Sequence, residues 1–392
     1  MAMNDGIARS QTWIALLGRR DMPTDGVEDY CTFLGRALAL RGVDLKQVRV
    51  PWVQKGWVRA FLQLQRECTD WREHWVIFQY TAFAWSRRGF SLGAVAALAI
   101  LRRRGVRCAV VFHEPWRHPG RSSWIGAIRG ACQDWVVRKL YGCSSKAIFL
   151  DPLELIAWLP DRDTKTVFIP IGANIPECLV RDTSVDRSNC LTKTVAVFCL
   201  SDRPNRHREL ADISHAARFI AKDGSKPRFI FIGRGTEEAR EEIESVFRGI
   251  RAEVSNIGLQ SAEQVSRILV ECDVMLCVRG ILYPRRGSAI AGICCGLPIV
   301  AYGDGSNIFP ISEAGLLLVP YRDHDALADS LARILDDRDL WRQMHERSIQ
   351  AQRKHFSWNH IADMFVESLN GDPRSAYGMR RKKPRGSTHI ES

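Results

Sequence analysis

The stretch from Tyr283 to Tyr302 reads YPRRGSAIAGICCGLPIVAY. Ser288 suits the N-cap of a short apolar helix over Ala289 to Cys295, because its hydroxyl can accept a hydrogen bond from a backbone N–H of the first turn. Gly296 suits the left-handed residue that commonly follows a helix, and Pro298 opens a run of strand-forming residues. The stretch therefore predicts a short helix that leads directly into a buried strand.

Short apolar runs recur on both sides of this stretch, with amphipathic helical segments between them. This order is typical of parallel sheets with crossover helices. The expected strands are the runs 12–17, 75–80, 108–112, 147–150, 166–170, 195–199, 228–232, 274–278 and 298–302. We therefore predict an α/β fold of two Rossmann-like, doubly wound domains that face a central cleft.

The polar stretch 177–192 is the best linker, which gives a first domain over 1–176 and a second over 193–350. The length of 392 residues suits two domains. Beyond Asn370, the basic sequence of 371–392 predicts a disordered tail.

The formal net charge of +12 is unevenly distributed along the chain. Residues 1–150 hold 23 Lys and Arg residues against 11 Asp and Glu residues, so they account for all of it. An anionic partner is expected for this half of the chain. Nucleic acid, anionic lipid and pyrophosphate-bearing substrates all remain open at this point.

The twelve cysteines are scattered and show no zinc-ligand spacing, which favours buried thiols in a reducing compartment. The N-terminus has no basic region followed by an apolar run, so we expect no signal peptide. No run reaches the ~18 apolar residues of a membrane span. These features predict a cytoplasmic protein.

The start of the predicted helix has the chemistry of an anion site. Arg285, Arg286, Gly287 and Ser288 would direct two guanidinium groups, a hydroxyl and backbone N–H groups at one place, which favours a diphosphate. The alternative is a buried connector helix preceded by an exposed arginine pair.

The segment GICCGLPIVAYGDGS resembles the part of family-four GT-B glycosyltransferases (glycosyl transferases group 1) in which a helix ending in CGLP leads into a strand. Further segments resemble that family in the same order, and the resemblance covers residues 12–369. They are GRRDMPTDGVE at 18–28, VFHE at 111–114, FIPIGANIP at 168–176, IFIGRG at 230–235, EAGLLLV at 313–319 followed by DALA at 325–328, and FSW at 356–358.

This resemblance implies transfer of a sugar from a nucleotide-diphosphate sugar to a glycan or lipid-linked acceptor, in the synthesis of cell-surface polysaccharide or glycoconjugates. It implies retention of the anomeric configuration, no metal, and no cofactor besides the nucleotide sugar as co-substrate. The first domain would bind the acceptor and the second the donor. A C-terminal helix over 351–370 would pack back on the first domain.

The resemblance also assigns site residues. His113 and Glu114 are the expected catalytic pair, although a structural histidine and an ion-paired glutamate are the alternatives. Arg203, Arg206, Gly233 and Arg234 would join 285–288 at the donor, unless their loops are simply solvated. Asp25, Gly26 and Asn174 are expected at the acceptor side of the cleft.

The sequence also departs from the family pattern. Many members carry two glutamates with seven residues between them, and Tyr283 and Ala291 stand at those places. A catalytically inactive GT-B-like partner or nucleotide-sugar-binding protein is therefore the alternative function. We expect no nucleic-acid partner, because the chain shows no compact recognition module. The acid pairs Asp161/Asp163 and Asp323/Asp325 are interpreted as surface loop acids rather than metal ligands.

Two basic stretches carry tryptophans at helical spacing, Trp52–Arg66 and Ser122–Tyr141. Such helices can lie on an anionic membrane surface. Packing against the core is the alternative, and it is favoured for the second stretch. We expect peripheral attachment to the inner face of the membrane through the first domain.

Overall fold

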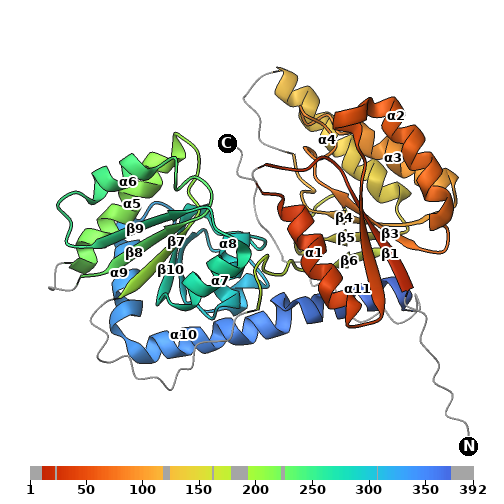
Figure 1. Cartoon of the computed structure of the whole chain (residues 1–392). Coiled ribbons are helices and arrows are strands. Elements are labelled where there is room, and N and C mark those ends of the chain that lie inside the picture. Colours follow the sequence, from red (N-terminus) through yellow and green to blue (C-terminus); the bar gives the residue numbers. More distant parts are fainter. Residues whose placement is uncertain are drawn as a thin grey trace, which may run out of the picture. The chain divides into compact units, whose positions relative to one another are not determined.

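The computed structural model describes residues 11–22, 24–117, 124–160, 163–177, 193–221, 226–306 and 308–371. The chain divides into two compact units (Figure 1). Unit 1 is Met1–Pro170 together with Ile361–Ser392, and unit 2 is Ile171–His360. Apart from Glu177, the expected linker lies outside the described residues, as does the basic tail after Gly371.

Unit 1 is built on a six-stranded parallel sheet with helices on both faces (Figure 1). In sheet order its strands are β2 (Val43–Arg49), β1 (Gln11–Leu17), β3 (Trp75–Tyr80), β4 (Arg107–Phe112), β5 (Lys146–Phe149) and β6 (Thr166–Phe168). Its helices are α1 (Gly26–Ala39), α2 (Trp52–Glu67), α3 (Leu92–Arg103), α4 (Trp124–Cys143) and the end of α11 (Trp358–Asn370), with short 3-10 turns at Cys68–Trp71 and Leu153–Leu155. Every residue of β3 is buried, as expected of a parallel strand that is covered on both faces.

The end of the chain belongs to unit 1. Trp75 Nε1 donates a hydrogen bond to Leu369 O at 3.1 Å, and Arg41 pairs with Asp363. The side chains of Gln11 and Asn370 are hydrogen bonded, so the start of β1 lies beside the end of α11. The last turns of α11 therefore complete the core of a unit whose other residues lie far upstream.

Unit 2 repeats the architecture with a second six-stranded parallel sheet (Figure 1). In sheet order its strands are β12 (Leu316–Pro320), β11 (Ile299–Gly303), β10 (Val274–Ile281), β7 (Thr194–Phe198), β8 (Arg228–Ile232) and β9 (Glu253–Gly258). Its helices are α5 (Asn205–Ile220), α6 (Arg240–Phe247), α7 (Ala262–Val270), α8 (Gly287–Cys294), α9 (His324–Asp336) and α10 (Arg338–Ala351), with short helical turns at Ile311–Glu313 and Gln352–Phe356. Both sheets confirm the predicted α/β, doubly wound fold.

The division of the chain differs from the expected one at two places. Residues 171–176 group with unit 2 rather than with unit 1, and so do residues 351–360. The contacts of Trp358 explain both differences, because its Nε1 donates to Ala173 O at 2.7 Å and its ring lies against Gly172. The two segments therefore hold each other inside unit 2.

The stretch around α8 folds as a helix followed by a strand, with one correction. The N-cap is Arg286, whose backbone is extended, so Ser288 lies inside the first turn and the prediction that it caps the helix is wrong. The C-terminus ends as predicted, because Gly296 has φ +72°. Its N–H donates to Ile293 O, and the N–H of Leu297 donates to Gly292 O, both at 2.9 Å, which is the Schellman motif.

In the described part of the chain, no helix combines the length and the apolar character that crossing a membrane requires.

Candidate functional site

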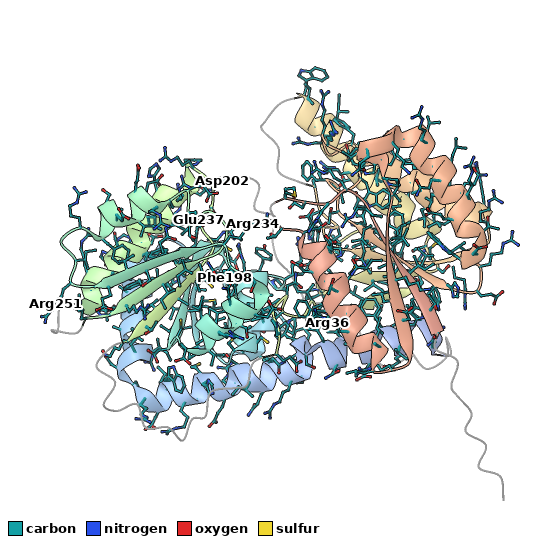
Figure 2. All side chains as sticks on the ribbon, viewed as in Figure 1. Arg36, Phe198, Asp202, Arg234, Glu237 and Arg251 are labelled. Atoms are coloured by element: carbon teal, nitrogen blue, oxygen red, sulfur yellow. The ribbon has the colours of Figure 1, made fainter. Side chains whose placement is uncertain are left out.

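The carboxyl ends of β7, β8 and β10 meet at one edge of the unit 2 sheet. The chain leaves β7 to build the sheet in one direction through β8 and in the other through β10, and such a switch point is where doubly wound sheets bind ligands. Figure 2 shows Arg234 and Asp202 at this end of the sheet and Arg251 at the opposite end. Several charged side chains lie at this edge.

Arg286 lies directly before α8 and is largely enclosed. Its Nη2 donates to Arg279 O at 2.7 Å, and its guanidinium lies 4.3 Å from the centre of the Tyr283 ring. Burial lowers the pKa of Arg286, Tyr283 raises it, and the nearby charge of Arg279 lowers it again. A partly buried cation beside a like charge gains stability when an anion binds to it.

Arg234, Arg279 and Arg286 converge on the end of β7. Burial raises the pKa of the Cys199 thiol there, and all three arginines oppose that rise. Burial also raises the pKa of Cys277 on β10 to about 12, against the opposing charges of Arg286 and Arg279. Three cationic side chains and the N-terminus of α8 therefore lie at one edge, as a diphosphate site requires.

The sequence did not single out Arg279, because it lies inside the apolar run of β10. The one sequence signal for an irregular strand end is the glycine that follows Arg279. In the structure, Gly280 has φ +67°, and the β10–β11 pairing shifts register between Cys277 and Ile281. An irregular strand end beside a ligand-binding edge commonly aims a side chain at the site.

The loop Gly233–Gly235 packs tightly against the end of β7. Gly233 has φ +89°, and a Cβ atom there would lie 2.8 Å from Cys199 Sγ. Glycine is thus required by both conformation and space. The exposed Arg234 between the two glycines is therefore carried on a closely fitted backbone.

Arg203 and Arg206 already have a partner. Both donate to Glu242 on α6, and the Arg206 Nη2–Glu242 Oε1 distance is 3.0 Å. Desolvation raises the pKa of Glu242, but the hydrogen bonds from the two arginines outweigh it and the pKa is lowered. The donor role predicted for Arg203 and Arg206 would therefore require this ion pair to open.

The predicted residues of the acceptor side fall in different units. Asn174 is half-buried in unit 2, beside the Ala173 carbonyl that Trp358 holds. Asp25 lies in unit 1 and caps α1, accepting from Val27 N at 3.1 Å and Glu28 N at 3.2 Å. It also pairs with Arg49 at 3.2 Å, and Gly26 is the first residue of the helix. Asp25 and Gly26 thus hold the start of α1.

His113 and Glu114 follow β4 at the carboxyl edge of the unit 1 sheet, where they were predicted. His113 Nε2 lies 2.7 Å from Gln79 Oε1, and its ring meets Tyr30 edge to face at 5.2 Å. The Gln79 Oε1 atom is an acceptor, so His113 Nε2–H donates this hydrogen bond. Burial raises the pKa of Tyr80, and the carboxylate of Glu114 adds to that rise.

Gln79 is a site residue that the sequence analysis missed. It is 1% exposed, and its side-chain Nε2 has no hydrogen-bond partner among the described residues. A buried, half-satisfied amide costs about 1–3 kcal/mol. The signal was present, because Gln79 is a polar residue inside the apolar run WVIFQY.

Three of the four acids have partners within the described residues. Asp163 accepts from Thr166 Oγ1, Asp323 caps α9, and Asp325 Oδ1 lies 2.8 Å from His215 Nε2, whereas Asp161 lies outside the described residues. Within the described ranges, His215, His324 and Asp325 bring their ligand atoms within 4.8 Å of one another. The absence of a required metal stays a prediction.

The chain is similar to known proteins in part of its sequence and in its fold. The family model described as glycosyl transferases group 1 matches residues 185–355. The matched residues lie largely in unit 2 and include Arg234, Arg279, Arg286 and α8. A search of curated protein sequences gives no match.

Solved structures resemble the whole chain. Anabaena Alr3699/HepE in complex with UDP and glucose has 13% identity and a TM-score of 0.61, covering 92% of this chain and 99% of its own. The sucrose-phosphate synthase of Thermosynechococcus elongatus has 17% identity and a TM-score of 0.62, covering 92% and 98%. A glycosyltransferase of Rickettsia africae has 13% identity and a TM-score of 0.62, covering 93% and 100%. The two units thus have the GT-B fold.

Proposed function

We propose that the protein is a glycosyltransferase that moves a sugar from a nucleotide-diphosphate sugar to a glycan or lipid-linked acceptor. Synthesis of cell-surface polysaccharide or glycoconjugates is the proposed process. The observation that carries the proposal is the convergence of Arg234, Arg279 and Arg286 beside the start of α8, inside the residues that match glycosyl transferases group 1. The similar HepE structure, which holds UDP and glucose, supports a nucleotide-sugar donor.

The arginines match the charge that develops during transfer. An acceptor oxygen forms a bond to the anomeric carbon, while the bond from that carbon to the diphosphate breaks and its electron pair leaves with the nucleoside diphosphate. Cations placed in advance around the leaving group stabilise this charge. They can supply what a divalent metal supplies in other transferases, so we propose a metal-independent reaction with retention of configuration. The acceptor proton would pass to His113 or Glu114.

Calorimetry with UDP, GDP, dTDP and ADP tests the donor site. We expect one of them to bind with micromolar to millimolar affinity, which corresponds to roughly −8 to −4 kcal/mol. Arg286→Ala should weaken that binding by about 1.5–3 kcal/mol, because it removes a charge-assisted contact to phosphate. Arg251→Ala, at the opposite end of the sheet, is the matched control. If the folded protein binds none of the four nucleotides, the proposal fails.

A second function is favoured by one observation. Ala291 is 3% exposed inside α8 and Tyr283 lies beneath Arg286, so neither place that often holds a glutamate in the family offers a carboxylate. A nucleotide-sugar-binding protein without turnover would bind the nucleotide as above. Assays of sugar release and transfer separate the two functions. For an enzyme, His113→Ala and Glu114→Gln should lower turnover and leave nucleotide binding nearly intact.

We also propose a cytoplasmic location with peripheral attachment to the inner face of the membrane through unit 1. Three large apolar side chains at the start of α4 support it, because Trp124 is 73%, Ile125 50% and Ile128 52% exposed. Exposed apolar residues on a basic unit fit an anionic lipid surface.

A further inference from the structure

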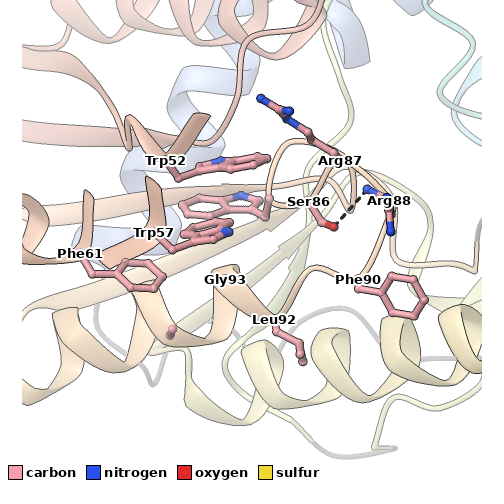
Figure 3. Close-up of a pocket in the computed structure, with 11 residues that line it drawn as sticks. Trp52, Trp57, Phe61, Ser86, Arg87, Arg88, Phe90, Leu92 and Gly93 are labelled. Atoms are coloured by element: carbon pink, nitrogen blue, oxygen red, sulfur yellow. Dashed lines mark hydrogen bonds between the residues drawn. The ribbon is translucent and has the colours of Figure 1, made fainter. Parts of the chain in front are cut away.

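Unit 1 contains an aromatic cavity of about 560 Å³ (Figure 3). Its walls come from α2, the loop after β3 and the start of α3. The volume lies in the range of small-molecule sites, which is roughly 300–1,000 Å³. The side chains that matter for its chemistry are Trp52, Trp57, Phe61, Phe90, Arg87 and Arg88.

The apolar wall is formed in advance of any ligand. The rings of Trp52 and Trp57 stack at 4.6 Å with an angle of 3° between their planes, and Phe61 lies 5.0 Å from Trp57. Gly93 of α3 makes room for this stack, since a Cβ atom there would lie 2.2 Å from the Trp57 ring. Trp52 Nε1 is held by Ala84 O at 3.1 Å. A wall that is already ordered loses little entropy when a ligand binds.

The rim of the cavity is cationic. Arg87 and Arg88 are exposed on the loop after β3, and Figure 3 shows Arg87 near Trp52 and Arg88 beside Ser86. Within the described residues, neither guanidinium makes a hydrogen bond or an ion pair. The combination is complementary to a molecule with an apolar chain and an anionic head group. A neutral glycan would leave both charges without a counter-charge.

The cavity is physically connected to the proposed catalytic residues. Trp85, which also lines it, donates from Nε1 to Gln79 O at 2.9 Å. The side chain of the same Gln79 holds His113. The loops that follow β2, β3 and β4 all leave the carboxyl edge of the parallel sheet. The cavity and His113 therefore lie at the same edge of the unit 1 sheet.

We propose that this cavity binds the lipid-phosphate part of the acceptor, with the apolar chain on Trp52, Trp57 and Phe61 and the phosphate on Arg87 and Arg88. The acceptor role rests on the proposed function, whereas binding of a phosphorylated lipid does not. The shared chemistry is an apolar chain with a phosphate head, and its source is an isoprenoid or an acyl lipid.

Equilibrium dialysis with farnesyl phosphate and with dihexanoyl phosphatidic acid, both below their micelle-forming concentrations, tests the proposal. At least one should bind the full-length protein, and which one binds identifies the chain type. Farnesol alone and inorganic phosphate alone should bind at least about tenfold more weakly, because each lacks half of the recognised chemistry. Arg87→Ala/Arg88→Ala should weaken binding by about tenfold or more.

The matched control is Arg102→Ala/Arg103→Ala, which removes an exposed arginine pair from the last turn of α3 in the same unit. It should leave lipid-phosphate affinity within about twofold of wild type. Equal losses in the two double variants would show a general charge effect and overturn the proposal. Trp57→Ala removes the ring from the apolar wall, and Trp57→Phe is tested beside it because the smaller change keeps a ring against Gly93. Circular dichroism confirms the folding of each variant.

Calorimetry with the nucleotide found to bind the wild type keeps the two proposals apart. Normal nucleotide binding with no binding of either phosphorylated lipid overturns the cavity and leaves the proposed function standing. Lipid binding without nucleotide binding does the reverse. Binding to phosphatidylglycerol vesicles with none to the monomeric lipids would also overturn the cavity, since it would show a membrane surface in its place.

Discussion

Arg279 and Arg286 are two like charges that lie close together at the carboxyl edge of the unit 2 sheet. Arg286 reaches the backbone oxygen of Arg279, and the charge of Arg279 lowers the pKa of Arg286. Two neighbouring like charges cost free energy, and a diphosphate bound as proposed would offset that cost. The two residues are therefore the part of unit 2 whose removal most clearly separates binding from folding.

Arg279→Ala should weaken nucleoside diphosphate binding by about 1.5–3 kcal/mol, because it removes one of the converging charges. Arg203→Ala should change binding by less than about 1 kcal/mol, since that side chain is exposed and already pairs with Glu242. Calorimetry on both variants checks the ranking. A larger loss for Arg203→Ala would show that the ion pair opens and that the sequence-based assignment is right.

Gln79→Leu should lower kcat by disordering His113, while leaving the KM of the donor nearly unchanged. The free energy of unfolding should hold or rise, because the variant removes a buried amide nitrogen without a partner. Gln79→Glu keeps the accepting oxygen and should retain more turnover than Gln79→Leu. Steady-state kinetics and urea unfolding of both variants decide this. A fall in stability with unchanged kcat would make Gln79 purely structural.

At this scale the sequence pointed to some of the candidate residues and not to others. Arg286 and Gly287 were predicted because a helix start has a local signature. Arg203 and Arg206 were assigned to the donor because their partner, Glu242, lies at a separation of 36 residues or more and no local pattern reveals the pairing. Arg279 was missed because its neighbours in the sequence are apolar and indicate only a buried strand.

At the turn from α8 into β11, the left-handed conformation of Gly296 allows α10 to pack closely against the turn. Gly296 is left-handed, and a Cβ atom there would lie 2.7 Å from the His345 ring of α10. His345 Nδ1 lies 2.6 Å from Gly296 O, and its ring stacks on Trp341 at 4.8 Å. The helix end, the next strand and α10 are thus fixed by one contact.

Gly296→Ala should therefore destabilise unit 2 by more than about 1 kcal/mol, through backbone strain and displacement of His345. Gly249→Ala is the matched control, because Gly249 has φ +80° and nothing within 4 Å of a new Cβ atom. The loss of stability in Gly249→Ala therefore measures backbone strain alone. Urea unfolding of the two variants gives the difference, and equal losses would show that the His345 contact adds nothing.

The pH dependence of unit 2 should include a contribution from His345. Burial lowers its pKa from the ordinary 6.5, against the raising effect of the hydrogen bond to Gly296. The unfolded chain therefore takes up the proton first as the pH falls. The stabilisation is present above about pH 6.5 and is lost below it. Urea unfolding at pH 7.5, 6.5 and 5.5 should show this loss, and His345→Gln should reduce its slope.

Both tryptophan-bearing helices pack part of their length on the core and expose large apolar side chains, among them Val58 of α2 and Trp124 of α4. Trp52 of α2 is buried, and Trp57 forms a wall of the aromatic cavity. In α4 the inward face holds Val136, Val137 and Leu140, while the large side chains near its start are exposed. Periodicity identifies residues that share a face, but not which face another element covers.

For the whole molecule, the uneven charge predicts salt-sensitive binding to anionic vesicles. Each basic residue near such a surface contributes on the order of 1 kcal/mol. A protein shortened to residues 1–371, which lacks the basic tail, should sediment with anionic liposomes at low salt and less at high salt. Trp124→Ser/Ile125→Ser/Ile128→Ser should reduce this binding. Equal sedimentation with neutral liposomes, or none with either, would contradict it and favour a soluble acceptor.

Unit 1 contains residues from the start and the end of the chain, and this determines when it can fold during synthesis on the ribosome. At roughly 5–20 residues per second, the intervening residues 171–360 take about 10–40 s to synthesise. During that interval the hydrogen bond from Trp75 to Leu369 and the ion pair of Arg41 with Asp363 cannot form. The N-terminal sheet, although translated first, can finish folding only after its neighbour has been made. A nascent chain stalled before residue 361 would therefore be a substrate for chaperones, and a peptide of residues 361–371 added to it should supply the missing helix.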